Sequence, residues 1–507
     1  MSILTYVRPP HQAKGHEESM VNSRNGLLLV LVVGLVLRVG LLVFFWDQPL
    51  TIVDETHYQM IAENILKHHE FSRIVGQPTA IRPPLYPIFL SSIYFITGGV
   101  NFNTIRIAQI VLSLGVIFIL YLLGKILFDE KSGILASLIF ATYPSFLFFT
   151  HLLLSEILFT FLMLLFVYYF LSFLYSQARA CEDTVRGSEF NSKDKRLLLA
   201  SVLLSFKKKN RAILLAGLFL GLGALTRSIL YPFLFITIFF IIIAYRGTLI
   251  EKSKWVLLLT LGFLLVVGPW TIRNFILFKN WVVIDTMGGL NLYMGNYEHT
   301  PLNRAWSAID LTGDKRWYHG HEKVLSEMNE AEKQEWAINK AKEFIYKHKW
   351  LTLKRNLIKA ANLWGLEREI IGAIINGNWP QLNKTAYLLI ITFVIFSSYG
   401  FVLVCSLIGI MYNLSFKRKD VLLCFVLICF FTGMHAIVFG HSRYHLPLIP
   451  LLAIFASWSL MNIKKIWKCS SLWMRIGSII FIIILVCIWV REILFIEGDR
   501  FLKNIRM

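Results

Sequence analysis

Long apolar runs alternate with short polar segments along most of this chain. Several of these runs reach the length that a helix needs to cross a bilayer. A polar stretch of 25 residues precedes the first run, and no small-residue cleavage site follows it, so we expect a retained span and not a signal peptide. The pattern predicts eleven spans, at residues 26–46, 104–127, 132–151, 155–176, 212–228, 229–245, 255–271, 385–413, 421–439, 447–463 and 475–492.

Two polar stretches between the spans also carry helical patterns. In the first, at 47–103, Tyr58, Ile61, Ile65 and Leu66 recur at helical spacing, which predicts a helix lying in the membrane interface. Pro83 and Pro84 then predict the start of a second helix. The other stretch, at about 273–383, contains "AEKQEWAINKAKEFIYKHKWLTLKRNLIKAANLW", which is typical of two amphipathic helices.

Basic residues collect in alternate loops. Nine lie between Arg179 and Arg211, for example, whereas the intervening short loops are poor in Lys and Arg. The positive-inside rule therefore predicts a cytoplasmic N-terminus and, with eleven spans, an outer C-terminus. The predicted parts are a cytoplasmic tail (1–25), an N-terminal transmembrane module (26–272, with a first outer loop at 47–103 and a cytoplasmic linker at 177–211), an outer helical loop (273–383) and C-terminal transmembrane helices (384–507).

Composition agrees with an all-α polytopic membrane protein. The 507 residues are 56% hydrophobic and 16% charged, whereas soluble chains carry about a quarter charged residues. Much of the net charge of +20 belongs to the predicted inner loops, which leaves little reason to expect nucleic acid as a partner. The six cysteines contain no CxxC pair, so neither a disulfide framework nor a zinc site is predicted.

Two adjacent acids, Asp54 and Glu55, follow the first span directly. Such acids can simply mark the boundary with water. However, other charged residues lie at or beside predicted outer ends of spans, where burying charge is costly and usually marks a site or a pairing. They are Arg82, Glu156, Arg227, Arg273 and Arg443. Arg227 and Arg273 can either extend to lipid head groups or bind a phosphate.

Carboxylates and arginines at one membrane depth favour a particular chemistry. A sugar joined to a lipid phosphate has a leaving group that departs as an anion, so it does not need the general acid of ordinary glycoside hydrolysis. One carboxylate must accept the proton of the acceptor, and cations must hold the phosphate. Arginine suits that second role because its forked donors bind phosphate oxygens.

At this point the sequence resembles a family. The acidic pair of "DETHY", which includes Tyr58, and the segment "RPPLYP", which includes Tyr86, resemble the type C (GT-C) membrane glycosyltransferases, among them the protein O-mannosyltransferases and the aminoarabinose transferase of lipid A. Further segments follow in the order of that superfamily, so the resemblance covers about residues 26–465. They are "GLGALTR", "PWTIRN", "GGLNLYMGN" and "RYHLPLIPLL".

The resemblance implies a GT-C fold with an extracytoplasmic site, in the plasma membrane of a bacterium, and inversion at the sugar's anomeric carbon. The donor would be a polyprenyl- or dolichyl-phosphate sugar, and the acceptor a protein, a lipid A-like lipid or a surface glycan. Asp54 matches the catalytic base and Glu55 its neighbour, which we assign to the acceptor pocket. Arg82 stands where the lipid A enzyme has a lysine near the lipid phosphate, and Glu156 matches an acid whose role stays open.

Other candidates have two interpretations. Arg443 is a candidate for the donor phosphate together with Arg82 and Arg273, and Tyr444 follows it directly. "GGLNLYMGN" can be a glycine-rich turn, or Asn291 and Asn296 can line a sugar pocket. The lipid A enzyme has a metal-associated acid where this chain has Ile81, and His441 and His445 are typical of interfacial hydrogen-bonding residues. We therefore predict no obligatory metal or other cofactor.

Two other functions compete with a glycosyltransferase. A transporter or flippase for lipid-linked sugars often shows repeated halves and charges near mid-bilayer, and neither is visible in this sequence. A polysaccharide polymerase or ligase would account for the outer loop and the arginines, but not for an acidic pair directly after the first span.

Overall fold

The computed structural model describes residues 13–46, 48–50, 52–186, 192–245, 247–303, 320–469 and 471–496. Within these residues, nine helical segments are long and apolar enough to cross a membrane. The chain is therefore a multi-pass integral membrane protein. The helices that contain these segments are α1 (Ala13–Phe44), α4 (Phe102–Leu127), α7 (Glu156–Arg186), α8 (Ser192–Thr226), α10 (Leu249–Phe278), α16 (Thr385–Asn413), α17 (Lys419–Ile437), η6 (Ser442–Leu448) continued by α18 (Ile449–Met461), and α20 (Leu472–Arg491) continued by the π-helical η7 (Glu492–Ile496).

Shorter elements connect these helices. The short helices and 3-10 turns are α2 (Val53–His68), α3 (Leu85–Ile96), α5 (Glu130–Ala141), α6 (Pro144–Phe149), η2 (Ser228–Leu230), α9 (Phe233–Ala244), α11 (Met287–Gly295), α12 (Glu322–Glu327), α13 (Glu330–Lys347), α14 (Lys349–Leu363), α15 (Glu369–Ile375), η5 (Pro380–Leu382) and α19 (Ile463–Cys469). A single antiparallel pair, β1 (Ser72–Ile74) and β2 (Gln77–Pro78), makes up the strands of the described residues. The all-α class predicted from the sequence is confirmed.

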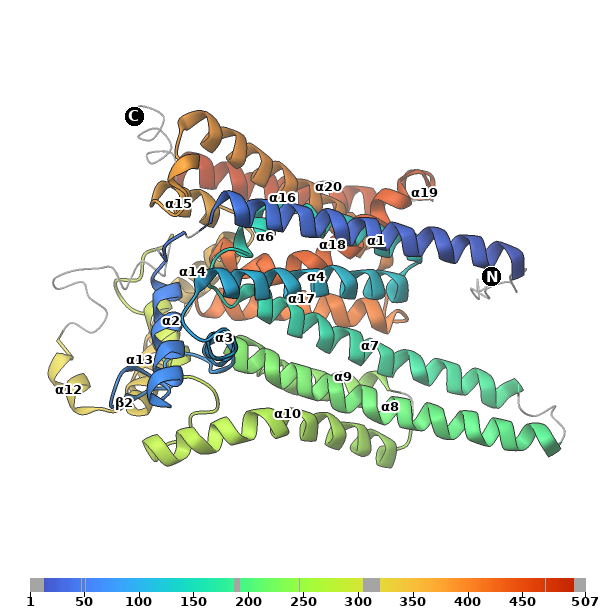
Figure 1. Cartoon of the computed structure of the whole chain (residues 1–507), viewed down its shortest axis with the longest axis horizontal. Coiled ribbons are helices and arrows are strands. Elements are labelled where there is room, and N and C mark those ends of the chain that lie inside the picture. The colour runs from blue at the N-terminus through green and yellow to red at the C-terminus, as the bar shows by residue number, and fades with distance from the viewer. Residues whose placement is uncertain are drawn as a thin grey trace.

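Most of the long helices lie side by side along the long axis of the molecule, and α2, α12, α13 and β2 gather at the left end in Figure 1. Helices on the outside of this bundle expose large apolar side chains, as on α1 (Leu29, 64%) and α10 (Leu257, 67%). Water would penalise that exposure, whereas lipid would not. Buried side chains of α4, α7, α8 and α18 form the core between the helices.

Two of the eleven predicted spans are shorter than a membrane crossing. The run at 132–151 is divided into α5 and α6 because Pro144 has no N–H to continue the first helix. The run at 229–245 begins with a 3-10 turn, and Pro232 lies between that turn and α9. The other nine predicted spans correspond to the membrane-length helices.

The helices predicted in the polar stretches are confirmed. α2 and α3 occupy the first stretch, and Pro84 is the residue directly before α3. α13 and α14 are the two amphipathic helices of the second. Helices α7 and α8 extend through most of the segment 177–211 that was predicted as a linker.

Arg38 lies inside the first span, where the sequence pattern predicts either a buried acid as its partner or an error in the span boundary. The structure gives a third answer. The side chain is fully buried in α1, its Nε donates to Ser113 Oγ at 2.8 Å, and its Nη1 donates to the carbonyl oxygens of Gly34 and Ala141. Ala141 is the last residue of α5, so this arginine binds a carbonyl oxygen that the helix end leaves free.

Candidate active site

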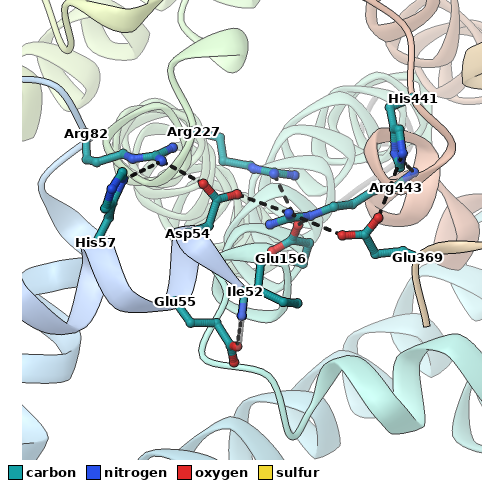
Figure 2. A network of polar contacts seen from close by, with 10 residues as sticks. All are labelled: Ile52, Asp54, Glu55, His57, Arg82, Glu156, Arg227, Glu369, His441 and Arg443. Atoms are coloured by element: carbon teal, nitrogen blue, oxygen red, sulfur yellow. Dashed lines mark hydrogen bonds and ion pairs between the residues drawn. The ribbon is translucent and has the colours of Figure 1, made fainter. Parts of the chain in front are cut away.

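The two adjacent acids lie in the first turn of α2, which begins directly after the loop that follows α1. Their side chains point in different directions (Figure 2). Glu55 turns towards backbone groups, whereas Asp54 turns towards arginines. Successive residues of an α-helix are rotated by about 100°, so neighbours cannot share one environment.

Glu55 connects the start of α2 to the loop that precedes α7. Its Oε2 accepts from the backbone N–H of Ile52 at 3.1 Å, and its Oε1 accepts from that of Leu153 at 2.8 Å. The residue is 1% exposed, so a ligand cannot reach the carboxylate. These contacts indicate a positioning role for Glu55 at the start of α2, and the acceptor-pocket role that the resemblance implied stays a prediction.

We therefore expect Glu55→Gln to destabilise the fold. The amide keeps one acceptor oxygen but places a donor against a backbone N–H, which should cost about 1–3 kcal/mol. Thermal unfolding of the purified chain in detergent would measure the loss. Turnover per folded molecule should fall far less than in an Asp54 variant, and an equally large fall would contradict the positioning role.

Asp54 lies between two arginines that are distant in sequence. Its Oδ1 accepts from Arg82 Nη2 at 2.6 Å, and its Oδ2 accepts from Arg443 Nη1 at 3.1 Å (Figure 2). Arg82 belongs to the loop before α3, and Arg443 belongs to η6. Three separate segments thus bring one carboxylate and two guanidinium groups together.

Glu156, the first residue of α7, completes the cluster from below the carboxylate of Asp54 (Figure 2). Its Oε1 accepts from Arg227 Nη2 at 3.2 Å and from Arg443 Nε. The Glu156 side chain is 0% exposed, whereas Asp54 keeps 30% of its side chain exposed. A ligand can therefore touch Asp54, while Glu156 holds Arg227 and Arg443 from the protein side.

The charges around Asp54 keep it ionised. Burial raises the pKa of its carboxyl, but the guanidinium groups of Arg443 and Arg82 outweigh burial and hold the pKa below its ordinary range. Opposite charges within a few ångströms have this effect. A carboxylate held in this way is a weak base while both arginines remain bound to it.

The three candidate tyrosines surround the cluster. Tyr58 is packed edge-to-face on Tyr86, with ring centroids 4.9 Å apart, and its ring lies 5.4 Å from the Arg82 guanidinium carbon. Tyr86 is buried and donates its hydroxyl to Gln109 Oε1 at 2.9 Å. The ring of Tyr444 lies 5.5 Å from the Arg227 guanidinium carbon. The rings of Tyr58 and Tyr444 pack against these arginines and limit their movement, and Tyr86 packs behind Tyr58.

Arg273, predicted as a ligand of the donor phosphate, is not part of this cluster. Its Nη1 donates to the carbonyl oxygen of Thr79 at 2.8 Å, and the guanidinium carbon lies 4.7 Å from the Trp270 ring. These contacts hold the loop before Arg82 in place. A role for Arg273 through the position of that loop agrees better with these contacts than direct phosphate binding.

The segment "GGLNLYMGN" is not a turn, since residues 287–295 form α11, and its role in a sugar pocket stays a prediction. The Asn296 side chain is occupied by structural contacts. Its Nδ2 donates to the carbonyl oxygens of Leu292 and Ile437, and its Oδ1 accepts from Lys359 Nζ. A Cβ on Gly295 would lie 1.9 Å from the carbonyl oxygen of Val438, so glycine is required for this close contact. Asn291 is half-buried within the same helix.

Three further polar residues near the cluster escaped the sequence prediction. His57 Nδ1 lies 3.2 Å from Arg82 Nη2. Asp285 lies close enough to Arg82 to be stabilised by its charge, although burial raises the pKa of this carboxyl overall. Glu369 Oε1 lies 3.7 Å from Arg443 Nη1. Glu369 lies within the predicted outer loop and not at the end of a predicted span, so the signal that identified Glu156 did not apply to it.

Among the described residues, no three His, Cys, Asp or Glu side chains are grouped closely enough to hold a metal ion. His441 lies against Glu369, with 3.8 Å between Nε2 and Oε2, and His445 Nε2 lies 3.1 Å from Glu367 Oε1. Both histidines therefore lie beside single carboxylates.

A family model supports the resemblance in one segment. Residues 81–180, which contain Arg82 and Glu156, match the model described as dolichyl-phosphate-mannose-protein mannosyltransferase. The resemblance to the protein mannosyltransferases is confirmed for this segment. No protein of curated function matches the chain.

Solved structures that are similar to this chain over more than nine tenths of its length include the following two. One is the archaeal oligosaccharyltransferase AglB from Archaeoglobus fulgidus, in complex with an inhibitory peptide and a dolichol-phosphate: 12% identity, TM-score 0.47, 92% of this chain covered. The chain spans about half the length of that protein (54%). The other is ArnT from Cupriavidus metallidurans bound to undecaprenyl phosphate: 13% identity, TM-score 0.43, 94% of this chain and 64% of that chain covered.

Proposed function

We propose that this chain is an inverting membrane glycosyltransferase that moves one sugar from a polyprenyl phosphate to an acceptor. The observation that carries the proposal is the position of Asp54, an accessible carboxylate bound between Arg82 and Arg443. The family match over residues 81–180 supports the same class of reaction.

The cluster balances its charges before any substrate enters. Asp54, Glu156 and Glu369 face Arg82, Arg227 and Arg443, so three carboxylates meet three guanidinium groups. Arginines fully committed to carboxylates cannot also bind a phosphate strongly. The donor phosphate must therefore share the guanidinium groups of Arg82 and Arg443 with Asp54.

Because Asp54 and the phosphate share these arginines, transfer of the acceptor's proton to Asp54 is linked to departure of the phosphate. The acceptor oxygen attacks the anomeric carbon from the face opposite the phosphate, and its proton passes to Asp54. The bond from that carbon to the phosphate oxygen breaks, and its electron pair stays on the phosphate. Once Asp54 is protonated, its attraction to Arg82 and Arg443 weakens. Both guanidinium groups can then stabilise the growing negative charge on the phosphate.

Entry of the donor should also strengthen the base. A phosphate that competes for Arg82 and Arg443 removes the interaction that holds the pKa of Asp54 low. The carboxylate is then a better proton acceptor only while the donor is bound.

The finer parts of the proposal concern the surroundings of the reaction. The donor is an undecaprenyl- or dolichyl-phosphate sugar, and the acceptor is a protein, a lipid or a surface glycan outside the cytoplasm. The N-terminus lies in the cytoplasm, and the chain works in a bacterial plasma membrane without an obligatory cofactor. The basic residues of alternate loops support this orientation.

The experiment that tests the proposal uses the full chain in detergent or lipid nanodiscs. Polyprenyl-phosphate hexoses are offered with a mixture of peptide, lipid and glycan acceptors, and released polyprenyl phosphate is measured by mass spectrometry. Release that requires an acceptor supports a transferase. Intact donor with every acceptor would count against it and favour a transporter.

Arg82→Ala should weaken binding of the donor as well as turnover. A charge-assisted hydrogen bond to phosphate contributes about 1.5–3 kcal/mol, so the donor affinity should fall about 10- to 100-fold. Binding of a radiolabelled polyprenyl-phosphate sugar would measure this directly.

Arg73→Ala is the matched control. It removes a guanidinium group that contacts His57 Nε2 at 3.3 Å but makes no contact with Asp54. Its donor affinity should stay within about twofold of the wild type. Unchanged affinity in Arg82→Ala would instead place the phosphate on Arg443.

A further inference from the structure

Helix α13 has the arrangement of a helix that faces water. Its buried positions are the small apolar residues Ala331, Ala337 and Ala341, and its exposed positions include Glu335 and Asn339. A helix at the surface of a protein buries its apolar side and exposes its polar side in this way. α13 is therefore a reference for the helix that follows it.

Helix α14 has the opposite arrangement. Three large apolar side chains follow one another at spacings of three and four residues, so they lie along one side of the helix. They are Trp350 (83% exposed), Leu353 (50%) and Leu357 (66%), which we call the α14 stripe. An exposed apolar surface of this kind marks a site of contact with a membrane or another protein.

The charged side of α14 is the side that the protein covers. Arg355 is 5% exposed and donates to the carbonyl oxygens of Tyr297 (2.7 Å) and Thr300 (3.0 Å). Lys359 is 1% exposed, and its Nζ donates to the carbonyl oxygen of Ile437 at 3.1 Å. These bonds fix the rotation of α14 about its axis. Turning the stripe inward would break them and carry both charges away from their partners.

The contacts of α14 place it at the end of a membrane-length helix. α14 lies at the end of the bundle that also carries α2 and α13 (Figure 1). Lys359 binds Ile437, the last residue of α17, and Trp364, directly after α14, donates its Nε1–H to Thr432 Oγ1 at 3.2 Å. Thr432 lies about 7.5 Å before the end of α17, at 1.5 Å per residue. Interfacial helices lie about 5–10 Å deep in the boundary between head groups and acyl chains, so the end of α14 reaches a suitable depth.

The surroundings of the stripe favour lipid over a protein partner. Lys349 and Lys354 are exposed, and at 100° per residue they lie on either side of the stripe. Their ammonium groups can reach lipid phosphates while their methylene chains stay in apolar surroundings. Tryptophan, as at Trp350, is enriched where a membrane meets water. Ile437 exposes 45% of its side chain on α17, so a lipid-accessible surface adjoins α14.

We propose that α14 docks on the bilayer, with the α14 stripe among the acyl chains of the leaflet nearest the candidate site and with Lys349 and Lys354 at lipid phosphates. The inference does not depend on the proposed function. It makes α14 a membrane anchor, whereas α13 faces water. The bilayer then holds Arg355 and Lys359, and the segment 296–300 that they bind, at a fixed depth.

The test identifies what touches the stripe. The photoreactive residue p-benzoylphenylalanine, which inserts into nearby C–H bonds, replaces Leu353 or Leu357 in the full chain. The same residue in place of Asn339, on the exposed side of α13, is the control for contact with water. In place of Leu257, which α10 exposes, it is the reference for contact with lipid. The proteins are irradiated in liposomes of phosphatidylcholine and phosphatidylglycerol, and the adducts are identified by mass spectrometry.

We expect phospholipid adducts at Leu353 and Leu357 in about the yield found at Leu257, and about tenfold more than at Asn339, because the stripe lies among acyl chains. If one stripe variant does not fold, the other position decides the matter. Lipid adducts at the stripe that are as rare as those at Asn339 would place it in water. Crosslinked dimers in place of lipid adducts would show that a second copy of the chain covers it. Either result would overturn the inference.

Discussion

Asp54→Asn should abolish turnover while the protein folds and binds its donor. The amide keeps the size of the side chain but cannot take a proton from the acceptor, and general-base catalysis contributes about 10²- to 10⁴-fold. Donor affinity should be equal or higher, because an asparagine competes less than a carboxylate for Arg82 and Arg443. Release of polyprenyl phosphate by the purified chain measures turnover, and binding of a radiolabelled donor measures affinity.

Glu343→Gln, which removes an exposed carboxylate on α13, provides the control for removal of an acidic charge elsewhere on the chain. Its turnover should match that of the wild type. If Asp54→Asn kept more than about a tenth of wild-type turnover, the carboxylate would not be the base.

Arg443→Ala should damage both stability and activity. The guanidinium group contacts the side chains of Asp54, Glu156 and Glu369, and its own side chain is only 9% exposed. Breaking a buried ion pair costs about 3–5 kcal/mol when the remaining charge is left without a partner. Glu156 keeps Arg227, so we expect a cost near the lower end of that range, together with loss of turnover.

A double-mutant cycle separates the two effects. Glu156→Gln removes the buried charge, so Arg443→Ala should cost less stability in that background, with a coupling of about 1–3 kcal/mol. Turnover should stay lost in the double variant because the phosphate still lacks its arginine. Thermal unfolding and donor release are measured on the same samples, and recovery of turnover together with stability would show that Arg443 is only structural.

The sequence predicted correctly those helices whose formation depends on the pattern of neighbouring residues. The helical spacing in 53–68 and the amphipathic pattern in 330–363 depend only on neighbouring residues, and α2, α13 and α14 form there. It was harder to predict where a single residue interrupts a long apolar helix. Pro144 divides an apolar run whose hydrophobicity alone predicted a span.

The site was predictable as a set of charges but not as a geometry. The grouping of Asp54, Arg82, Glu156, Arg227 and Arg443 agrees with charges expected at one depth. By contrast, Arg273 binds the carbonyl oxygen of Thr79, 194 residues away, and no sequence pattern specifies such a contact. The different directions of Asp54 and Glu55 follow from helix geometry and could have been predicted once a helix was expected there.

The most direct test of the central claim is mass spectrometry of lipid-linked sugars and surface glycans. The cells carry the wild-type chain, Asp54→Asn or no copy. The proposed reaction predicts that a polyprenyl-phosphate sugar accumulates and that one glycan, lipid or protein loses a sugar, equally in the variant and in the null. A wild-type profile in cells with Asp54→Asn, beside a defect in the null, would contradict Asp54 as the base of a glycosyl transfer.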